Sequence, residues 1–300
     1  MTAGADPSSA PRLGICLSEF PQDPDGRWRN VAEVVQRVEA SGADGLWLAD
    51  HILWHSKAID AQSSLPALAS HATSITIGSC VLQMPLRDPV TVAKTMANTQ
   101  MMAPGRVVCG LGIGENVEEY ERLHKSMATR GRVIEESIEE IRRIWSEAGG
   151  TRWMNPAPVD IPIWVGGRAE AARRRAARLG DGWLPYLCSP RWFARHRALM
   201  EEEAEAAGRN HHDITKAVVT FVDVPAIESA QQGAAKLEHW FGFDPAPLMG
   251  FLLRGSADEV AQQLHEYVDA GASEVIVVIA NDRPLDVLDE LTPAFAALTT

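Results

Sequence analysis

Short apolar runs alternate with longer amphipathic segments along the whole chain. The apolar runs favour β-strands, and they cover residues 13–20, 45–49, 75–82, 106–113, 161–165, 182–186, 217–224 and 274–280. The longer segments repeat apolar side chains every three or four residues, which is typical of helices with one buried face. These helices are expected over residues 28–40, 65–71, 90–102, 132–148, 169–179, 191–207, 256–270 and 285–298. The pattern therefore predicts eight strand–helix units.

The predicted strands are expected to pair in parallel. Several of them, such as residues 218–222 and 275–279, are almost continuous apolar runs, as expected when both faces of a strand are buried. Parallel neighbours need a crossover helix between them, and eight such units can close into a barrel. We therefore expect an α/β protein with a single (β/α)8 TIM barrel. A doubly wound open sheet is the alternative, although one domain of that type normally uses fewer strands.

Two segments exceed what a minimal barrel needs. Residues 116–129 are polar, and residues 225–250 carry the apolar side chains Trp240, Phe241, Phe243 and Met249. Both segments follow strands, so both are expected as inserted loops on the C-terminal face, where barrel active sites lie. The second is expected to be a lid, a subunit contact, or a loop that packs its own aromatic side chains on the rim.

Composition and charge exclude several classes of protein. Of the 300 residues, 46% are hydrophobic and 23% are charged, which excludes a disordered or collagen-like chain. The 28 basic and 40 acidic residues give a net charge of -12, which argues against a nucleic-acid partner. No apolar stretch is long enough for a membrane span. The four cysteines form no C-x-x-C pair and are expected to be free thiols in a reducing cytoplasm.

The chain is expected to form one domain after a short tail. Residues 1–11 contain neither the basic nor the apolar segment of a signal peptide, and they are expected to be disordered. Residues 12–300 then form one domain, and the 300-residue chain supplies about 37 residues for each of the eight strand–helix units, which is normal for a barrel with inserted loops.

Candidate chemistry lies where the second and third strands end. Asp50 and His51 follow the second strand, and an adjacent carboxylate and imidazole can support proton transfer. Alternatively, Asp50 caps the next turn and His51 packs on the rim. The third strand ends in small residues that would let a ligand approach the backbone, although a well-packed barrel interior has the same composition.

The fourth strand carries glycine at every second position and then a carboxylate. The run Gly110-Leu111-Gly112-Ile113-Gly114-Glu115 differs from a dinucleotide fingerprint because Glu115 stands where that motif has glycine. Alternating glycines leave one face of the strand without side chains, so a flat ring system is expected there, with Glu115 beside it as a general acid or base. Alternatively, Glu115 is a rim carboxylate bonded to a neighbouring amide.

The fifth strand ends in Gly166 and Gly167 before a predicted helix. Exposed amides at a helix N-terminus favour phosphate, and Arg168 would add a charged contact. A tight turn is the alternative interpretation. His211 and His212 lie in a polar turn without further ligands at metal-site spacing, so we expect no metal.

Six motifs, taken in order, resemble the bacterial luciferase-like superfamily. They are LWLADH (46–51), RDPVTVAK (87–94), APGRVVCGLGIG (103–114), RGRVIEES (130–137), IPIWVGG (161–167) and GDGWLP (180–185). The resemblance extends from residue 12 to 298 and implies a (β/α)8 barrel that binds a flavin or deazaflavin on its C-terminal face. The W-x-A-D-H motif is most similar to the branch that uses the deazaflavin coenzyme F420.

The resemblance also implies roles for individual residues. His51, Glu115 and Trp54 would be catalytic, although Trp54 lies one residue closer to the histidine than in the family pattern. Cys80-Val81 would be a non-prolyl cis peptide under the tricyclic ring, and Gly166 and its three following residues would hold the cofactor phosphate. The full expected cofactor set is Asp50, Ser79, Cys80, Val81, Gln83, Gly112, Ile113, Gly114, Gly166, Gly167, Arg168 and Ala169.

The implied activity is hydride transfer between F420 and a small organic substrate, with His51 and Glu115 as acid and base. A monooxygenase that uses reduced FMN and oxygen is the first alternative, and a non-enzymatic flavin-binding protein and a metal-dependent hydrolase are two others. The basic residues that bind a sugar phosphate in one branch have no clear match, while Trp54, Trp240, Phe241 and Phe243 favour an apolar or aromatic substrate. We further expect a cytoplasmic homodimer with no nucleic-acid or membrane partner.

Overall fold

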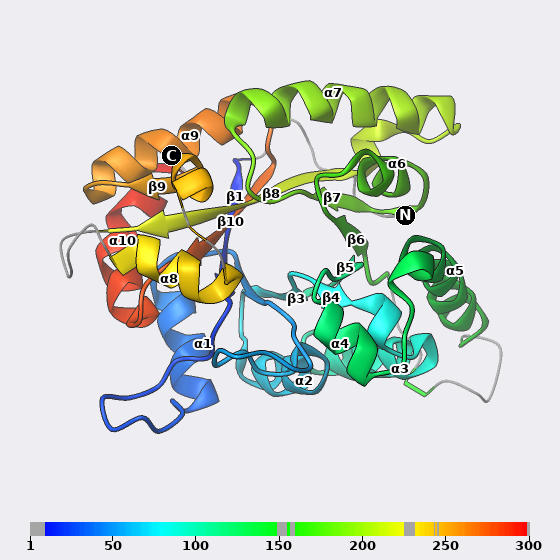
Figure 1. Cartoon of the computed structure of the whole chain (residues 1–300), viewed down its shortest axis with the longest axis horizontal. Helices are drawn as coiled ribbons and strands as arrows, with labels where there is room; N and C mark the ends of the chain where they lie inside the picture. The colour runs from blue at the N-terminus through cyan, green and yellow to red at the C-terminus, as the bar shows by residue number, and fades with distance from the viewer. Residues whose placement is uncertain are drawn as a thin grey trace.

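Eight parallel strands close into a barrel in the computed structural model, which describes residues 10–148, 155–156, 160–224, 232–242, 244 and 246–298 (Figure 1). The barrel strands are β1 (Arg12–Leu17), β2 (Gly45–Leu48), β3 (Thr76–Ser79), β5 (Val107–Gly112), β6 (Ile163–Gly166), β7 (Gly182–Leu184), β8 (Thr215–Asp223) and β10 (Glu274–Ile279). Each strand pairs with the next along the chain, and β10 pairs with both β8 and β1. The predicted TIM barrel is therefore confirmed, and the open sheet is excluded.

A helix follows each barrel strand and covers its outer face. These helices are α1 (Val31–Ala40), α2 (Ala61–His71), α3 (Pro89–Met102), α5 (Arg130–Ala148), α6 (Glu170–Leu179), α7 (Pro190–Ala206), α9 (Ala257–Asp269) and α10 (Pro284–Leu298). Side-chain caps explain where several begin: Asp60 caps α2, Ser189 caps α7, and Ser256 forms a capping box with Glu259 on α9. The sequence pattern thus located all eight units, with ends displaced by a few residues.

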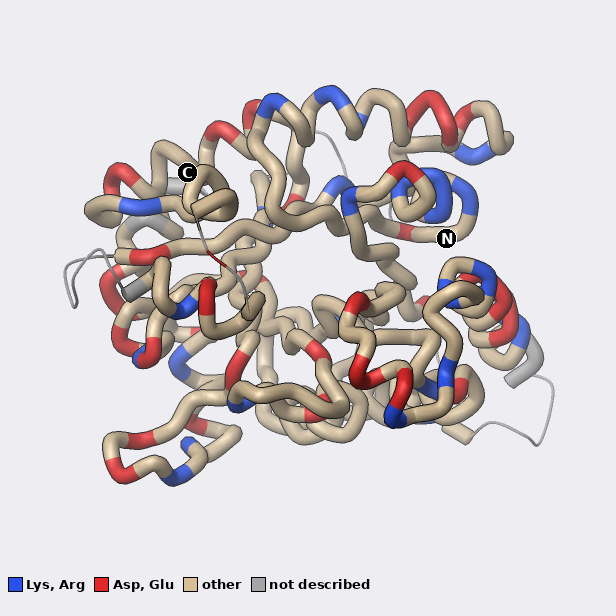
Figure 2. Tube along the Cα trace, viewed as in Figure 1, with Lys and Arg blue, Asp and Glu red and all other residues tan. Residues whose placement is uncertain are grey.

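The barrel interior is filled by large side chains that glycines accommodate. Trp47 of β2 is fully buried and stacks on Trp164 of β6, with ring centroids 5.0 Å apart. A Cβ atom at Gly14 or at Gly78 would lie 2.4 Å from an atom of the Trp47 ring, so no side chain larger than hydrogen fits at either position. Figure 2 shows charged residues mainly on the surrounding helices, which leaves the barrel wall to apolar packing.

Two short strands extend the barrel beyond the predicted elements. The predicted third strand divides into β3 and β4 (Leu82–Gln83), because the Cys80-Val81 peptide between them leaves the line of the sheet. β4 pairs with β5, and β9 (Leu252–Arg254) pairs with the end of β8. Both additions lie toward the C-terminal ends of the strands they join.

The described parts of both predicted insertions lie on the C-terminal face, on either side of the barrel mouth in Figure 1. The first contains α4 (Val117–Arg122), and the second contains α8 (Gln232–Phe241). Short 3₁₀ helices occur at Met84–Leu86, Met127–Thr129, His211–Asp213 and Ala246–Phe251. The α8 rings of Trp240 and Phe241 lie 6.4 Å and 5.9 Å from the ring of Phe221 on β8, so this part of the second insertion packs on the barrel rim.

Some expectations concern residues outside the described ranges. Residues 1–9 of the predicted tail and the aromatic residue Phe243 are among them. No helix in the described part of the chain is long and apolar enough to cross a membrane.

Candidate functional site

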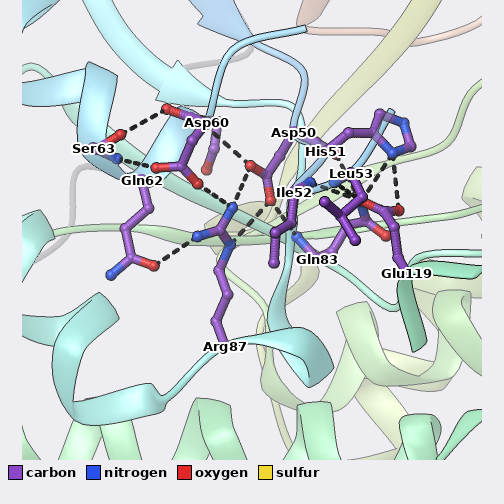
Figure 3. Close-up of polar contacts among 12 residues, drawn as sticks. Asp50, His51, Ile52, Leu53, Asp60, Gln62, Ser63, Gln83, Arg87 and Glu119 are labelled. Carbon is purple, nitrogen blue, oxygen red and sulfur yellow. Dashed lines mark hydrogen bonds and ion pairs between the residues drawn. The ribbon is translucent and has the colours of Figure 1, made fainter. Parts of the chain in front are cut away.

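The imidazole of His51 is held by a carboxylate from the first insertion, that of Glu119 (Figure 3). Its Nδ1 lies 3.0 Å from Oε2 of Glu119 on α4, and the Glu119 side chain is completely buried. The other carboxylate oxygen of Glu119 accepts hydrogen bonds from the backbone N–H groups of Ile52, at 2.6 Å, and Leu53, at 3.0 Å. One carboxylate therefore fixes both the imidazole and the loop that carries it.

The neighbouring amide of Gln83 determines which imidazole nitrogen carries the proton. Its Nε2 donates to the backbone oxygen of Asp50 at 2.9 Å and to Glu119 Oε2 at 3.0 Å, which uses both of its hydrogens. Gln83 therefore has no hydrogen left for His51, and His51 Nδ1 donates to Glu119. Nε2 of His51 remains available to an external partner.

The carboxylate of Glu119 is ionised despite its burial. Burial raises the pKa of Glu119, but the hydrogen bonds from His51 and from nearby N–H groups outweigh burial and leave this pKa below its ordinary value. A buried negative charge beside His51 stabilises the imidazolium that forms when Nε2 takes up a proton. The pair can thus accept a proton at Nε2 and return it.

The Asp50 carboxylate makes a separate set of contacts. Arg87 donates from Nη2 and Nε to its two oxygens at 2.5 Å and 3.1 Å, and the backbone N–H groups of Ala61 and Gln83 donate at 3.2 Å and 3.1 Å. Arg87 also contacts Asp60 at 2.6 Å, so this guanidinium joins the end of β2 to the start of α2. Asp50 therefore bonds to the first residue of α2 and to Arg87, and not to the turn that directly follows it, where the capping interpretation placed it. Its cofactor contact stays a prediction.

The ring of Trp54 stacks on the ring of His51, and its predicted catalytic role stays a prediction. The two rings are 3.8 Å apart at 15°. The row continues from Trp54 to His55 at 4.5 Å and from His55 to His239 of α8 at 5.1 Å. A line of rings therefore connects His51 to the second insertion.

The Cys80-Val81 peptide is cis, at the position that the resemblance implies. A Cβ atom at Gly110 would lie 1.9 Å from the backbone oxygen of Ser79, and one at Gly112 would lie 2.3 Å from Cγ2 of Val81. The glycine face of β5 is consequently not bare, which corrects that expectation. A flat ring on this side would meet Val81 rather than the strand itself.

The side chain of Ser79, at the end of β3, hydrogen-bonds to β5. Its Oγ donates to the Gly110 oxygen at 2.8 Å and accepts from the Gly110 N–H at 3.0 Å. Ser79 therefore fastens β3 to β5 below the cis peptide. Its predicted cofactor contact is not tested by these bonds.

Glu115 lies at the mouth, and its carboxylate contacts a tyrosine hydroxyl instead of the neighbouring amide considered from the sequence. The hydroxyl of Tyr186, after β7, donates to Glu115 Oε2 at 3.3 Å. Burial, and then the charge of Glu115, raise the pKa of Tyr186 to about 12, so this hydroxyl keeps its proton. The structure thus brings Glu119, rather than Glu115, to His51. Just before Glu115, the carbonyl of Ile113 accepts a hydrogen bond from the hydroxyl of Tyr120 on α4. Gly114 has a φ of 67°.

The predicted phosphate site has the features of an anion-binding helix start. Gly167 has a φ of 118°, which favours glycine, and its N–H donates to the Leu184 oxygen at 3.1 Å. Ala169, the N-cap of α6, has no side chain that could occupy the N–H groups of the first turn. Arg168 is exposed and donates to the Leu187 oxygen at 2.7 Å. These residues fit a phosphate.

The sequence interpretation missed Glu119 and Arg87. Glu119 stands three residues after Asn116, the N-cap of α4, and that N-cap spacing is the one local signal that predicts a helix there. No local signal connects Glu119 to His51, which is 68 residues away. In the described ranges, no group of three His, Cys, Asp or Glu side chains is placed to share a metal ion.

The chain is similar to several known proteins. An uncharacterised protein of Mycobacterium tuberculosis is 35% identical over 164 residues, which cover 50% of this chain and 57% of that relative's length. An F420-dependent glucose-6-phosphate dehydrogenase of Amycolatopsis mediterranei is 23% identical over 294 residues, covering 83% of this chain and 87% of the relative.

A solved F420-dependent secondary alcohol dehydrogenase, in complex with an F420-acetone adduct, has a similar fold. It superposes with a TM-score of 0.80 at 18% identity, covering 96% of this chain and 99% of that one. The family model described as luciferase-like monooxygenase matches residues 12–248. Since that match covers most of the barrel, the chain belongs to the luciferase-like monooxygenase family.

Proposed function

We propose that this protein is an oxidoreductase that transfers a hydride between coenzyme F420 and a small organic substrate. The observation that carries the proposal is the His51–Glu119 pair, which presents Nε2 of an oriented imidazole at the barrel mouth. Hydride transfer to or from an alcohol carbon needs a partner for the hydroxyl proton, and an imidazole backed by a buried carboxylate supplies one. Relatives that use F420 support the choice of cofactor.

The residues at the mouth fit a deazaflavin. Gln83 Oε1 is buried and has no hydrogen-bond partner among the described residues, so it could accept an N–H from a ring. Val81 and Gly112–Gly114 would lie against that ring, and Gly166–Ala169 would hold the phosphate. When bound, F420 supplies a two-electron hydride donor or acceptor.

Each side chain then has a distinct part in the reaction. Nε2 of His51 takes the proton that leaves an alcohol, or returns it to a carbonyl in the reverse direction. Glu119 orients the imidazole, and Trp54 covers one face of it. Glu115, bonded to Tyr186, would act as a second acid or base or would orient the substrate. Asp50, Arg87 and Ser79 keep the strand ends that carry these groups in place.

A monooxygenase that uses reduced FMN and oxygen is the second candidate. The description of the matching family favours it. The two candidates differ in whether a proton partner is needed for the substrate hydroxyl, and the His51–Glu119 pair favours hydride transfer.

The experiment compares His51→Gln with the unchanged protein in two measurements. Fluorescence titration with F420 is expected to give dissociation constants within about threefold of each other, because His51 is not proposed to hold the cofactor. F420-dependent turnover of small neutral alcohols is expected to fall by about 100-fold or more, the usual contribution of a general acid or base. An unchanged turnover, or no F420 binding by the unchanged protein, would contradict the proposal.

The expected assembly and location belong to the same proposal. We propose a homodimer in the cytoplasm, which the mass from light scattering and the location of a tagged copy would each test.

A further inference from the structure

A cavity lies on the C-terminal face between the ends of β1 and β10 and the inserted helix α8. Its volume is about 430 Å³, within the range of small-molecule sites. A smaller cavity of about 20 Å³ adjoins it, and both are lined by Glu19, Lys57, Asn281 and Asp282. His55 also lines the larger cavity, so the row of rings from His51 and Trp54 ends at its wall.

Two buried N–H donors at this corner have no acceptor among the described residues. Asn281 is 3% exposed, and its Oδ1 accepts from the backbone N–H of Arg283 at 2.8 Å, which leaves Nδ2 as the outward donor. That Nδ2 and Nε1 of Trp240, which is 6% exposed, have no hydrogen-bond partner in the described part of the chain. Both residues line the smaller cavity. A buried donor without a partner is unfavourable, so an incoming acceptor is stabilised there.

The charges around the donors are already balanced. Nζ of Lys236 lies 2.5 Å from Glu19 Oε2 and 2.5 Å from Asp282 Oδ1, so one ammonium is held between two carboxylates. The charge of Lys57 acts on Asp282 as well, and together with Lys236 it lowers the pKa of that carboxyl. The two cations thus match the two anions, and a phosphate dianion would face both carboxylates.

We propose that this corner is a substrate subsite for a neutral oxygen acceptor, a carbonyl or hydroxyl group, and that it discriminates against phosphate. The inference rests on the proposed function, because it places an oxygen group at the end of the substrate that lies away from His51. Asn281 Nδ2 and Trp240 Nε1 bind the oxygen. The carbon skeleton extends past His55 and Trp54 toward His51. The small cavity has room for one oxygen-sized group, while the larger one holds the skeleton.

The test measures binding to the full chain without cofactor, so it does not depend on F420. Four probes share one ring and differ in the attached group: cyclohexanone, cyclohexanol, cyclohexylammonium and cyclohexyl phosphate. Titrations followed by saturation-transfer NMR are expected to show cyclohexanone and cyclohexanol binding at least about tenfold more tightly than cyclohexyl phosphate. Equal or tighter binding of the phosphate would overturn the proposal.

Substitutions at the two donors locate the binding. Asn281→Asp keeps the oxygen that accepts from Arg283 but loses the donor, so it is expected to weaken cyclohexanone about tenfold and to strengthen cyclohexylammonium. Trp240→Phe removes the N–H and keeps an aromatic ring, and it is expected to weaken cyclohexanone about threefold. Trp145→Phe, on outer helix α5, is the matched control because its N–H donates to Ala93. Unchanged cyclohexanone binding in both pocket variants, or an equal loss in the control, would overturn the assignment.

The variants also separate this inference from the function it rests on. F420 titration of each variant is expected to match the unchanged protein. If F420 fails to bind anywhere but the probe pattern holds, the proposed function fails and the subsite stands. If F420 binds and the probe pattern is absent, the subsite fails alone.

Discussion

Val81 occupies the space that a side chain at Gly112 would need. A Cβ atom at Gly112 would lie 2.3 Å from Cγ2 of Val81, and one at Gly166 would lie 2.8 Å from Cγ1 of the same side chain. The glycines of β5 and β6 therefore leave the space in which the Val81 side chain, between β3 and β4, packs. The position of Val81 at the site thus depends on the absence of side chains at Gly112 and Gly166 on the neighbouring strands.

Gly112→Ala is expected to destabilise the protein, because Val81 must move to admit the new methyl group. Overpacking of this kind costs about 1–3 kcal/mol of unfolding free energy, which urea denaturation measures. Gly250→Ala is the control, because no atom of the other described residues, its own chain neighbours apart, lies within 4 Å of its added Cβ. The double variant Val81→Ala with Gly112→Ala is expected to recover part of the loss. A Gly112→Ala protein as stable as the control would contradict this packing.

Arg87→Met is expected to cost about 3–5 kcal/mol, because it leaves the buried carboxylate of Asp50 without its cation. The Arg87 side chain is only 7% exposed, and its partner Asp50 is fully buried. Arg122→Met is the matched control, since Arg122 pairs with Glu118 where both side chains are more than half exposed. That change is expected to cost under about 0.5 kcal/mol. Similar losses in the two variants would show that burial does not determine the effect.

Glu274→Gln is expected to stabilise the protein at pH 8 but hardly at pH 4. Glu274 at the start of β10 is 1% exposed, and burial raises its pKa to about 7. The folded state then binds more protons than the unfolded state between the ordinary value of 4.5 and about 7, so stability falls as pH rises through that window. The loss reaches up to about 3 kcal/mol. Thermal unfolding of both proteins across pH 4–8 checks this; an advantage of equal size at every pH would contradict it.

Glu119→Gln is expected to lower F420-dependent turnover by about 100-fold, because an amide neither accepts from His51 Nδ1 with a full charge nor stabilises the imidazolium. Glu115→Gln is the comparison, because its carboxylate contacts Tyr186 instead. That variant is expected to raise KM more than it lowers kcat, as for a group that orients the substrate. Steady-state kinetics of the two variants decide between these roles. A larger loss of kcat in Glu115→Gln would return the acid–base role to Glu115.

The sequence predicted the barrel well because each unit has its own local pattern. Apolar periodicity located the eight strands and their helices, and capping residues such as Ser256 located helix starts. The division of the third strand was missed, since it depends on space left by Gly110 and Gly112 on another strand.

The site was predictable only where adjacent residues determine it. Asp50 and His51 were identified together, yet they face different partners, Arg87 and Glu119, which lie 37 and 68 residues away along the chain. Glu115 was identified as a candidate acid or base because it follows the glycine pattern directly, whereas no partner for His51 was predicted. Glu119 reaches His51 because the short helix α4 lies beside the barrel mouth, and local sequence does not specify that contact.

Cofactor identity is the central claim, and a direct competition measures it. The purified protein would be mixed with equal concentrations of F420 and FMN, separated from free cofactor by gel filtration, and analysed by absorbance and mass spectrometry. The account predicts that F420 is retained and FMN is not. Retention of FMN without F420 would contradict it.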